Sequence, residues 1–398
     1  MKRKLVQINT VFNASTGRIM TDIQRHAEKA GYDTISFVGR PPVSGEVKGK
    51  VFGNPFSFWT HVILTTLFDA QGYGSYFSTK KLIRWIKEEN PDIIHLHNLH
   101  GYYLHIPSFC KFLSQEYQGK VFWTFHDCWP VTGHCAYFTS VNCDNWKKEC
   151  YHCPQKTEYP ISFFLDGSRR NYRMKKKWFE SIPNLTIIAP SKWVKEIVQE
   201  SFLKDKKIEV VNNGIDLNVF SPKVNHTIWG KYHIPQGKKI LLGVANIWDK
   251  RKGLNDFIEL SRAMSDDYHI VLVGLTKAQI KKMPSRITGI ERTQDREELV
   301  KLYSNAHIFV NPSLEESFSL VTLEAMACGT PVIVLDTSAV KELVSEDNGV
   351  VLKNHTPDDY IRAIQVIENM KLQKSKICKH AQIYDSQINA LKILKLYE

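Results

Sequence analysis

Short apolar runs alternate with amphipathic stretches along the whole chain. The runs have the length of single β-strands and contain few polar residues, which is typical of strands buried on both faces of a parallel sheet. They are Lys4–Ile8, Thr34–Val38, Asp92–Leu96, Val121–Phe125, Leu185–Ala189, Lys239–Val244, His269–Val273, His307–Val310 and Pro331–Leu335. Helical periodicity is clearest in Gly17–Ala30, in Ser78–Glu89 and in the tail from Asp358 to Glu398. This order predicts parallel sheets covered by helices on both faces.

The same series of strands and helices starts twice, the second time at Lys239. With 398 residues, the chain is also longer than one ordinary core supports. We therefore expect an α/β protein with two Rossmann-like domains, at residues 1–188 and 189–372, whose parallel sheets face each other across a cleft. A C-terminal helix at residues 373–398 is expected to return to the first domain. In such sheets, ligands bind at the carboxyl ends of the strands.

Composition limits the class of protein without choosing a function. Hydrophobic residues make up 43% and charged residues 24%, which excludes wholesale disorder. The run Leu5–Ile8 is too short for a signal peptide and Phe56–Phe68 is too short for a membrane span, so we expect a cytoplasmic protein with reduced cysteines. The net charge of +12 indicates an anionic partner, which could be nucleic acid, nucleotide phosphate or an anionic membrane. The absence of a recognition motif and the scatter of basic residues argue against nucleic acid.

The stretch from Asn311 to Val334, NPSLEESFSLVTLEAMACGTPVIV, contains the most informative chemistry. A loop with Glu316 follows a strand, and Ser317–Leu320 is expected to open a helix that carries Glu324 about two turns in. The amides and the positive dipole end of a helix start suit a diphosphate. A carboxylate further along can accept hydrogen bonds from ribose hydroxyls. The alternative is an amphipathic helix with two solvated glutamates.

This stretch resembles the C-terminal signature of glycosyltransferase family 4, which comprises retaining enzymes of GT-B fold. The matching residues are Glu316, Phe318, Leu320, Glu324 and Ala325–Val332. Further matches are Thr124–His126, Ala189–Ser191, Asn213–Asp216 and the Lys252-Gly253 pair. The resemblance covers nearly the whole chain, and the cysteines discussed below are similar to those of a bacterial surface-polysaccharide subgroup of the colanic acid, capsule or O-antigen type.

The resemblance implies roles for individual residues. Catalytic roles would belong to His126 at the reacting face of the sugar, to Glu316 on the donor sugar and to Lys252 on its diphosphate. The donor-binding residues would be Gly17, Asn246, Arg251, Lys252, Glu316, Ser317, Phe318, Ser319, Leu320, Val321 and Glu324. The chain departs from the family at Ser317 and Ser319, where glycines are usual. It also departs at Ala245-Asn246, where many members have an arginine, and Arg251 is the candidate replacement for that cation.

The implied reaction transfers a hexose from a nucleoside diphosphate sugar to a lipid-linked oligosaccharide or polysaccharide in cell-surface glycan or lipopolysaccharide biosynthesis. The first domain would bind the acceptor and the second the nucleotide sugar. Retention would need neither a protein nucleophile nor a catalytic metal, because the leaving diphosphate helps to deprotonate the acceptor. Two other classes remain open: a nucleic-acid-binding protein and a catalytically inactive sugar-binding scaffold.

Six of the eight cysteines lie between Cys110 and Cys153. The densest group is Cys135, Cys143, Cys150 and Cys153, which ends in a Cys-x-x-Cys pair within a long polar loop. A loop of this length needs something to hold it. Four thiolates suit a tetrahedral structural zinc ion, and buried free thiols are the alternative.

Two further segments allow more than one interpretation. His95 and His97 share a face of one predicted strand, where they could bind a metal, contact the acceptor or pack in the core. The segment Arg169–Phe179 contains six cations and ends in aromatic residues. It is either a solvated basic helix face or, together with Phe56–Phe68, a surface that rests on anionic lipid.

Overall fold

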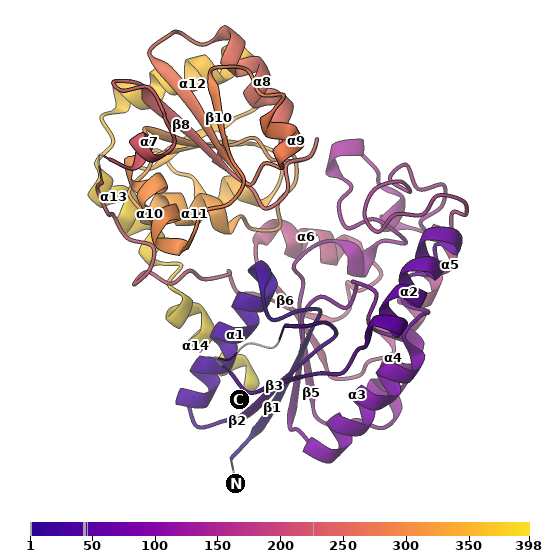
Figure 1. The fold of residues 1–398 in the computed structure, drawn as a ribbon. Coiled ribbons are helices and arrows are strands. Elements are labelled where there is room, and N and C mark those ends of the chain that lie inside the picture. The colour runs from indigo at the N-terminus through magenta and orange to yellow at the C-terminus, as the bar shows by residue number, and fades with distance from the viewer. Residues whose placement is uncertain (1, 43–44, 46, 226) are drawn as a thin grey trace. The chain divides into compact units, whose positions relative to one another are not determined.

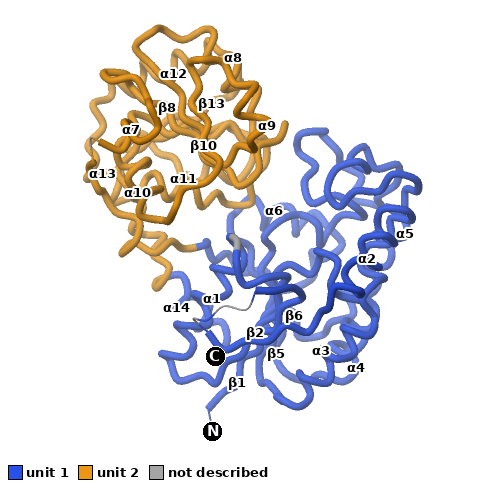
Figure 2. The backbone as a smooth tube through the Cα atoms, viewed as in Figure 1, with its two compact units in different colours: residues 1–213, 389–398 blue, residues 214–388 orange. Residues whose placement is uncertain are grey.

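The computed structural model describes residues 2–42, 45, 47–225 and 227–398. The chain folds into two compact units, each built on one parallel sheet covered by helices (Figure 1). Unit 1 consists of residues 1–213 and 389–398, and unit 2 of residues 214–388 (Figure 2). Within the described residues, no helix has both the length and the apolar character that a membrane span requires.

The sheet of unit 1 has seven strands in the order β3-β2-β1-β4-β5-β6-β7, and neighbouring strands pair in parallel. The strands are β1 (Lys4–Asn9), β2 (Asp33–Val38), β3 (Gly49–Val51), β4 (Ile93–Leu96), β5 (Lys120–Thr124), β6 (Leu185–Ala189) and β7 (Lys207–Val210). The strand order reverses between β1 and β4. In open sheets, ligands bind beside the carboxyl ends of the strands at such a reversal.

The helices of unit 1 cover both faces of this sheet. They are α1 (Ala14–Lys29), α2 (Pro55–Phe68), α3 (Tyr76–Glu89), α4 (Ile106–Gln115), α5 (Ser168–Glu180), α6 (Lys192–Glu200) and the end of α14 (Ser386–Tyr397). Helices α1 and α14 lie on one side, and α3, α4 and α5 lie on the other (Figure 1). The ring of Tyr397 packs against that of Phe122 at 4.9 Å between centroids, and its backbone oxygen accepts a hydrogen bond from Lys120 Nζ (2.9 Å). Of the expected C-terminal helix at residues 373–398, only residues 389–398 belong to unit 1, and α13 (Lys374–Gln382) belongs to unit 2.

Unit 2 contains a six-stranded parallel sheet in the order β10-β9-β8-β11-β12-β13, which reverses between β8 and β11. Its strands are β8 (Lys239–Val244), β9 (Tyr268–Val273), β10 (Ile287–Ile290), β11 (Ile308–Asn311), β12 (Val332–Leu335) and β13 (Gly349–Leu352). Its helices are α7 (Ile228–Lys231), α8 (Leu254–Ala263), α9 (Lys277–Ile280), α10 (Arg296–Asn305), α11 (Leu320–Ala327), α12 (Pro357–Met370), α13 (Lys374–Gln382) and the short η4 (Ala339–Leu343). Successive residues of β8 point to opposite faces of the sheet. Leu241 and Leu242, for example, belong to different hydrophobic clusters.

The nine predicted strands are confirmed, with ends that differ by at most one residue. The strands that the sequence pattern missed are β3, β7, β10 and β13, and each of them lies at an edge of its sheet. Their side chains are only partly buried, so they lack the continuous apolar run that marks a central strand. The apolar segment Phe56–Phe68, for which no helix was predicted, belongs to α2.

A long segment between β5 and α5, residues 125–167, contains only the short helical turns η1 (Trp129–Val131), η2 (Thr139–Val141) and η3 (Asn145–Lys147). It is packed around buried aromatic side chains such as Trp129 and Trp146. Lys175 of α5 reaches into it, and its buried Nζ donates hydrogen bonds to Trp129 O (2.7 Å) and Thr132 O (2.9 Å). The interpretation of Arg169–Phe179 as a uniformly exposed basic face is therefore wrong at Lys175.

Candidate active site

The loops that follow β8 and β11 are residues 245–253 and 312–319. Both begin at the carboxyl ends of neighbouring parallel strands of unit 2. These strands flank the reversal of strand order, where sheets of this type bind ligands. The two loops are joined directly: Leu314 N donates to Arg251 O at 2.9 Å, and Arg251 Nη1 donates to Glu315 O at 3.0 Å. The predicted donor residues of the second domain lie at these carboxyl ends of the strands.

Lys252 and Glu316, one from each loop, form an ion pair. Gly253 allows the two loops to lie close together, because it has a φ of 72° and a Cβ atom there would lie 2.6 Å from the Cβ of Pro312. The Lys252 and Glu316 side chains are 18% and 13% exposed. Burial by itself would raise the pKa of the Glu316 carboxyl, but the charges of Lys252 and Arg251 outweigh it and hold the pKa below its usual range. The site thus presents a cation suited to phosphate beside an ionised carboxylate suited to hydroxyl groups.

The start of α11 combines a strained serine with amides suited to anions. Ser319 has a φ of 79°, which costs a non-glycine residue on the order of 1 kcal/mol. Its hydroxyl accepts a hydrogen bond from Asn311 Nδ2 (2.9 Å) and lies 2.9 Å from Thr322 Oγ1, and these contacts stabilise the turn. The amides of Leu320 and Val321 have no acceptor within the helix, as is general for a first turn, and such amides bind phosphate groups.

Glu324 is one turn into α11, not two as predicted, because the helix begins at Leu320 and not at Ser317. Its side chain is only 6% exposed. The hydroxyl of Tyr303, from α10, donates to its Oε2 at 3.1 Å. The alternative of a solvated glutamate is therefore excluded for Glu324.

The other predicted donor residues of unit 2 differ in their surroundings. Asn246 is exposed. Arg251 is partly buried and braces the two loops through its bond to Glu315 O. Phe318 is buried, and its ring packs 5.6 Å from that of Tyr384, so it supports the loop from the core side.

His126 follows β5 in unit 1 and belongs to a stack of histidines. Its ring lies 5.3 Å from that of His97, which lies 4.5 Å from that of His95. The predicted shared face of His95 and His97 is therefore confirmed. His95 is fixed by hydrogen bonds to the Tyr397 hydroxyl (2.6 Å) and to Thr124 Oγ1 (2.8 Å). These rings pack in the core, and in the described part of the chain no group of three or more His, Cys, Asp or Glu side chains is arranged as a metal site.

The hydrogen bonds of this stack define the tautomer of His126. The Gln7 side-chain nitrogen donates to Met20 O (2.9 Å), so the Gln7 oxygen is the acceptor that faces His97 Nε2 (3.1 Å). His97 Nε2 therefore carries the proton, and His97 Nδ1 accepts from His126 Nε2 at 3.0 Å. In His126, Nδ1 is then the acceptor nitrogen, suited to a hydrogen bond from a sugar hydroxyl.

We expect the stability of unit 1 to fall as the pH decreases from about 6.5 to about 4. Burial lowers the pKa of His95 to about 3 and that of His126 to about 4, from an ordinary value of 6.5. Below pH 6.5 the unfolded chain therefore binds protons that the folded protein does not, and each such histidine removes about 1.4 kcal/mol per pH unit. Urea unfolding at several pH values should show a shallower pH dependence in His95→Gln. The exposed His152 provides the control His152→Gln, which should keep the wild-type slope, and equal slopes in all three proteins would contradict the expectation.

Asp127 and Gly17 are two further features of unit 1. Asp127 accepts hydrogen bonds from His100 Nε2 (2.7 Å) and from Trp129 N (2.9 Å), which fixes the backbone just after the histidine. Gly17 lies in the first turn of α1, where a Cβ atom would be 2.1 Å from Phe12 O. Glycine is therefore required there for the close approach of the helix to the preceding loop.

Parallel sheets of this topology, with a helix start and a lysine at the strand-order reversal, define a nucleotide-binding class of α/β protein. A family model described as Glycosyltransferase Family 4 matches residues 16–219, and one described as Glycosyl transferases group 1 matches residues 238–369. The chain belongs to glycosyltransferase family 4, and it is a glycosyltransferase.

Relatives of known sequence agree at low identity. The colanic acid biosynthesis glycosyl transferase WcaC of Escherichia coli K12 is 24% identical over 321 residues, which cover 77% of this chain and 74% of WcaC. An N,N'-diacetylbacillosaminyl-diphospho-undecaprenol alpha-1,3-N-acetylgalactosaminyltransferase of Campylobacter jejuni is 29% identical over 219 residues, which cover 51% of this chain and 57% of that enzyme.

Solved structures show the same two-domain fold. Sucrose-phosphate synthase from Thermosynechococcus elongatus has a TM-score of 0.74 at 17% identity and covers 100% of this chain and 98% of its own. Anabaena HepE in complex with UDP and glucose has a TM-score of 0.67 at 15% identity and covers 99% of each chain. The predicted GT-B fold is therefore confirmed.

Sequence reasoning missed several supporting residues. Gln7 is a fully buried polar residue inside the apolar run of β1, and that interruption was its only local signal. Tyr303 and Ser338 gave no local signal, because they reach Glu324 Oε2 and Glu316 N only through the tertiary fold.

Proposed function

We propose that this protein is a retaining hexosyltransferase that transfers a sugar from a nucleoside diphosphate sugar to a lipid-linked oligosaccharide or polysaccharide. Its place would be in cell-surface glycan biosynthesis. The names of WcaC and of the Campylobacter enzyme, which acts on a diphospho-undecaprenol-linked sugar, support the acceptor class. The complexes of HepE with UDP and with UDP-glucose support the donor class.

In this proposal, unit 2 binds the donor. Lys252 and the amides at the start of α11 hold the diphosphate, since both favour negative charge. Glu324 accepts hydrogen bonds from the ribose hydroxyls, and Glu316 from hydroxyls of the donor sugar. The existing Lys252–Glu316 pair keeps the Glu316 carboxylate ionised and orients both side chains before the donor arrives.

In unit 1, His126 would contact the reacting face of the sugar through Nδ1. Its low pKa, which results mainly from burial, keeps the ring neutral at physiological pH. The leaving diphosphate takes the proton of the acceptor hydroxyl on the same face of the sugar, so that the configuration at the anomeric carbon is retained. The protein contributes positioning and charge stabilisation, and the reaction uses no protein nucleophile and no catalytic metal.

The observation that carries this proposal is the Lys252–Glu316 pair at the strand-order reversal of unit 2. The test is to incubate the protein with UDP-, GDP-, ADP- and CMP-sugars and an undecaprenol-diphosphate-linked glycan fraction, and to measure nucleotide release. Release with one donor and a product of unchanged anomeric configuration, determined by NMR, are expected. Release with an inverted product would refute retention, and no release with any donor would refute the proposed reaction.

We further propose that unit 1 rests on the inner face of the cell membrane through α2. One face of this helix exposes Phe56 (83%), Trp59 (61%) and Ile63 (54%), at helical spacing. The segment of residues 125–167 brings Phe163 next to the end of the helix, because Phe163 N donates to Thr66 O at 3.0 Å. Exposed apolar side chains gathered in this way suit the interfacial region of a lipid bilayer.

The double variant Phe56→Ser/Trp59→Ser is expected to bind vesicles about tenfold more weakly than the wild type, because it removes buried apolar area from the lipid contact. Cosedimentation with vesicles of phosphatidylglycerol and phosphatidylethanolamine measures this. Ile383→Ser is the matched control, since Ile383 is 55% exposed and lies in unit 2. Equal binding by both variants would show that α2 does not contact lipid.

A further inference from the structure

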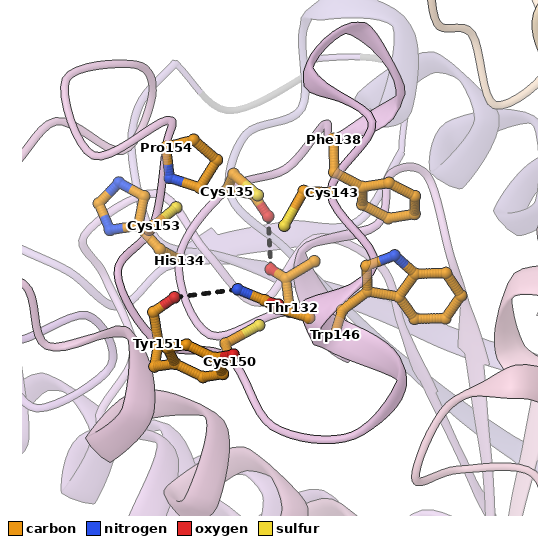
Figure 3. A pocket seen from close by; sticks show the side chains of 11 residues that line it. Thr132, His134, Cys135, Phe138, Cys143, Trp146, Cys150, Tyr151, Cys153 and Pro154 are labelled. Atoms are coloured by element: carbon orange, nitrogen blue, oxygen red, sulfur yellow. Dashed lines mark hydrogen bonds between the residues drawn. The ribbon is translucent and has the colours of Figure 1, made fainter.

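The segment of residues 125–167 brings four thiols to one small cavity. Cys135, Cys143, Cys150 and Cys153 all line a cavity of about 10 Å³, which is enough space for about one water molecule. Figure 3 shows the four cysteines on different sides of this cavity, with Trp146 and Phe138 beside them. All four cysteines are in the reduced form. These cysteines are separated by up to 18 positions in sequence, so their meeting is a property of the fold.

The sulfurs of this cluster make polar contacts with the backbone and with each other. The amide of Gly133 donates to Cys150 Sγ at 3.1 Å, and the thiols of Cys135 and Cys153 are hydrogen-bonded to each other. Donation of N–H groups to sulfur stabilises a thiolate more than a thiol. Free thiols that merely fill core space would not need such donors.

A buried cation stands beside the cluster without a carboxylate in contact. Lys175 is fully buried, and in the described residues its Nζ bonds only to the carbonyl oxygens of Trp129 and Thr132. Burial lowers the pKa of Lys175 to about 7, and negative charge on Cys150, Cys135, Asp69 or Asp127 opposes this effect. A buried cation requires compensating negative charge nearby. Four thiolates around a divalent cation would supply it, since their net charge is −2.

His134 adds a further polar group at the same cavity. Its Nδ1 lies 2.8 Å from Asp69 Oδ1, while its buried Nε2 has no hydrogen-bond partner. Asp69 also accepts from the amide of Gly167, at the end of the segment. A histidine with an unpartnered ring nitrogen therefore lines the cavity together with the thiols, and the cavity is unlike an ordinary apolar void.

We propose that Cys135, Cys143, Cys150 and Cys153 bind one Zn²⁺ ion as a four-thiolate structural site. Zinc prefers tetrahedral thiolate ligands at about 2.3 Å, and a closed set of four protein ligands is typical of structural sites. The sulfur atoms are not yet arranged as a metal site in this structure, so they must converge on the cavity as the ion binds. Each thiol releases its proton to solvent, and no group is oxidised or reduced.

Such an ion would fix a segment that has no regular helix or strand and that begins directly at Phe125 and His126. A segment of this length in a compact domain needs ties of its own. The zinc site would therefore set the backbone position of His126 indirectly, and it would stabilise unit 1 whether or not the proposed transfer reaction is correct.

The test is the metal content of the full-length protein, purified without chelators and measured by inductively coupled plasma mass spectrometry. We expect about one zinc per chain, lost in Cys143→Ser but kept in Cys378→Ser, a thiol outside the cluster. Because Cys143→Ser could fail to fold, wild-type protein exchanged with Co²⁺ gives a second measurement. Thiolate-to-cobalt charge transfer and the strong visible bands of tetrahedral Co²⁺ are expected.

Two results would overturn the proposal. One is wild-type protein without stoichiometric zinc that also fails to take up Zn²⁺ or Co²⁺ after reduction. The other is an intact mass lower by two hydrogens than that of the reduced chain, which would show that the cluster forms a disulfide.

Discussion

The Lys252→Ala variant is expected to lose most of its transfer activity, with kcat reduced about 100-fold or more. In the proposed reaction, the leaving diphosphate gains negative charge in the transition state, and Lys252 is the cation that neutralises it. The ion pair adds to this loss, because removal of Lys252 leaves the largely buried Glu316 carboxylate without its partner. That carboxylate would then repel the diphosphate. Nucleotide release at saturating donor concentration measures the effect.

Lys250→Ala is the matched control for this variant. Lys250 lies in the same loop but is exposed and is expected to contribute little to catalysis. Thermal unfolding of both variants tests whether the loop is still folded. A folded Lys252→Ala protein with the kcat of the wild type would show that Lys252 does not act on the leaving group.

The second large effect is expected for His126→Ala, with kcat reduced about 100-fold while the KM for the donor changes little. His126 belongs to unit 1, whereas the residues proposed to hold the nucleotide belong to unit 2. In the proposed reaction its role is confined to the reacting face of the sugar, while its Nε2 is held by His97 Nδ1. Steady-state kinetics with varied donor concentration separate the two parameters.

His152→Ala serves as its control, because this histidine is exposed and lies in the cysteine-containing segment. A rise in KM with unchanged kcat in His126→Ala would place the histidine in donor binding instead of in the reacting step. Unchanged values of both parameters would remove it from the active site.

Much of the fold could be predicted because buried parallel strands are apolar on both faces. The central strands β1, β4, β5, β8 and β11 each appear as one continuous apolar run. The edge strands could not be recognised in this way, since they have solvent on one side. The helical nature of α2 was missed for a different reason: its buried residues are the polar His61 and Thr65, whereas its apolar residues are exposed or only partly buried.

The candidate site was predictable where its residues are close in sequence. Glu316, Ser319 and Glu324 fall within one motif, and their positions follow from one loop and one helix. The partners that define their chemistry lie far away: Lys252 is 64 positions from Glu316, and Tyr303 is 21 positions from Glu324. Only the tertiary fold brings these groups together, so the pKa of Glu316 and the burial of Glu324 could not be read from the sequence. The same holds for the burial of Lys175 among carbonyl groups.

The central claim, that unit 2 contains a nucleotide-sugar site, is tested most directly by thermal unfolding in the presence of UDP-, GDP-, ADP- and CMP-sugars. Ligand at about 100 times its Kd stabilises the folded state by about 2.7 kcal/mol. We expect the sugars of one nucleotide to raise the melting temperature of the wild type, and this shift to be lost in Glu324→Ala. The absence of a shift with every donor, in protein that unfolds cooperatively, would contradict the claim.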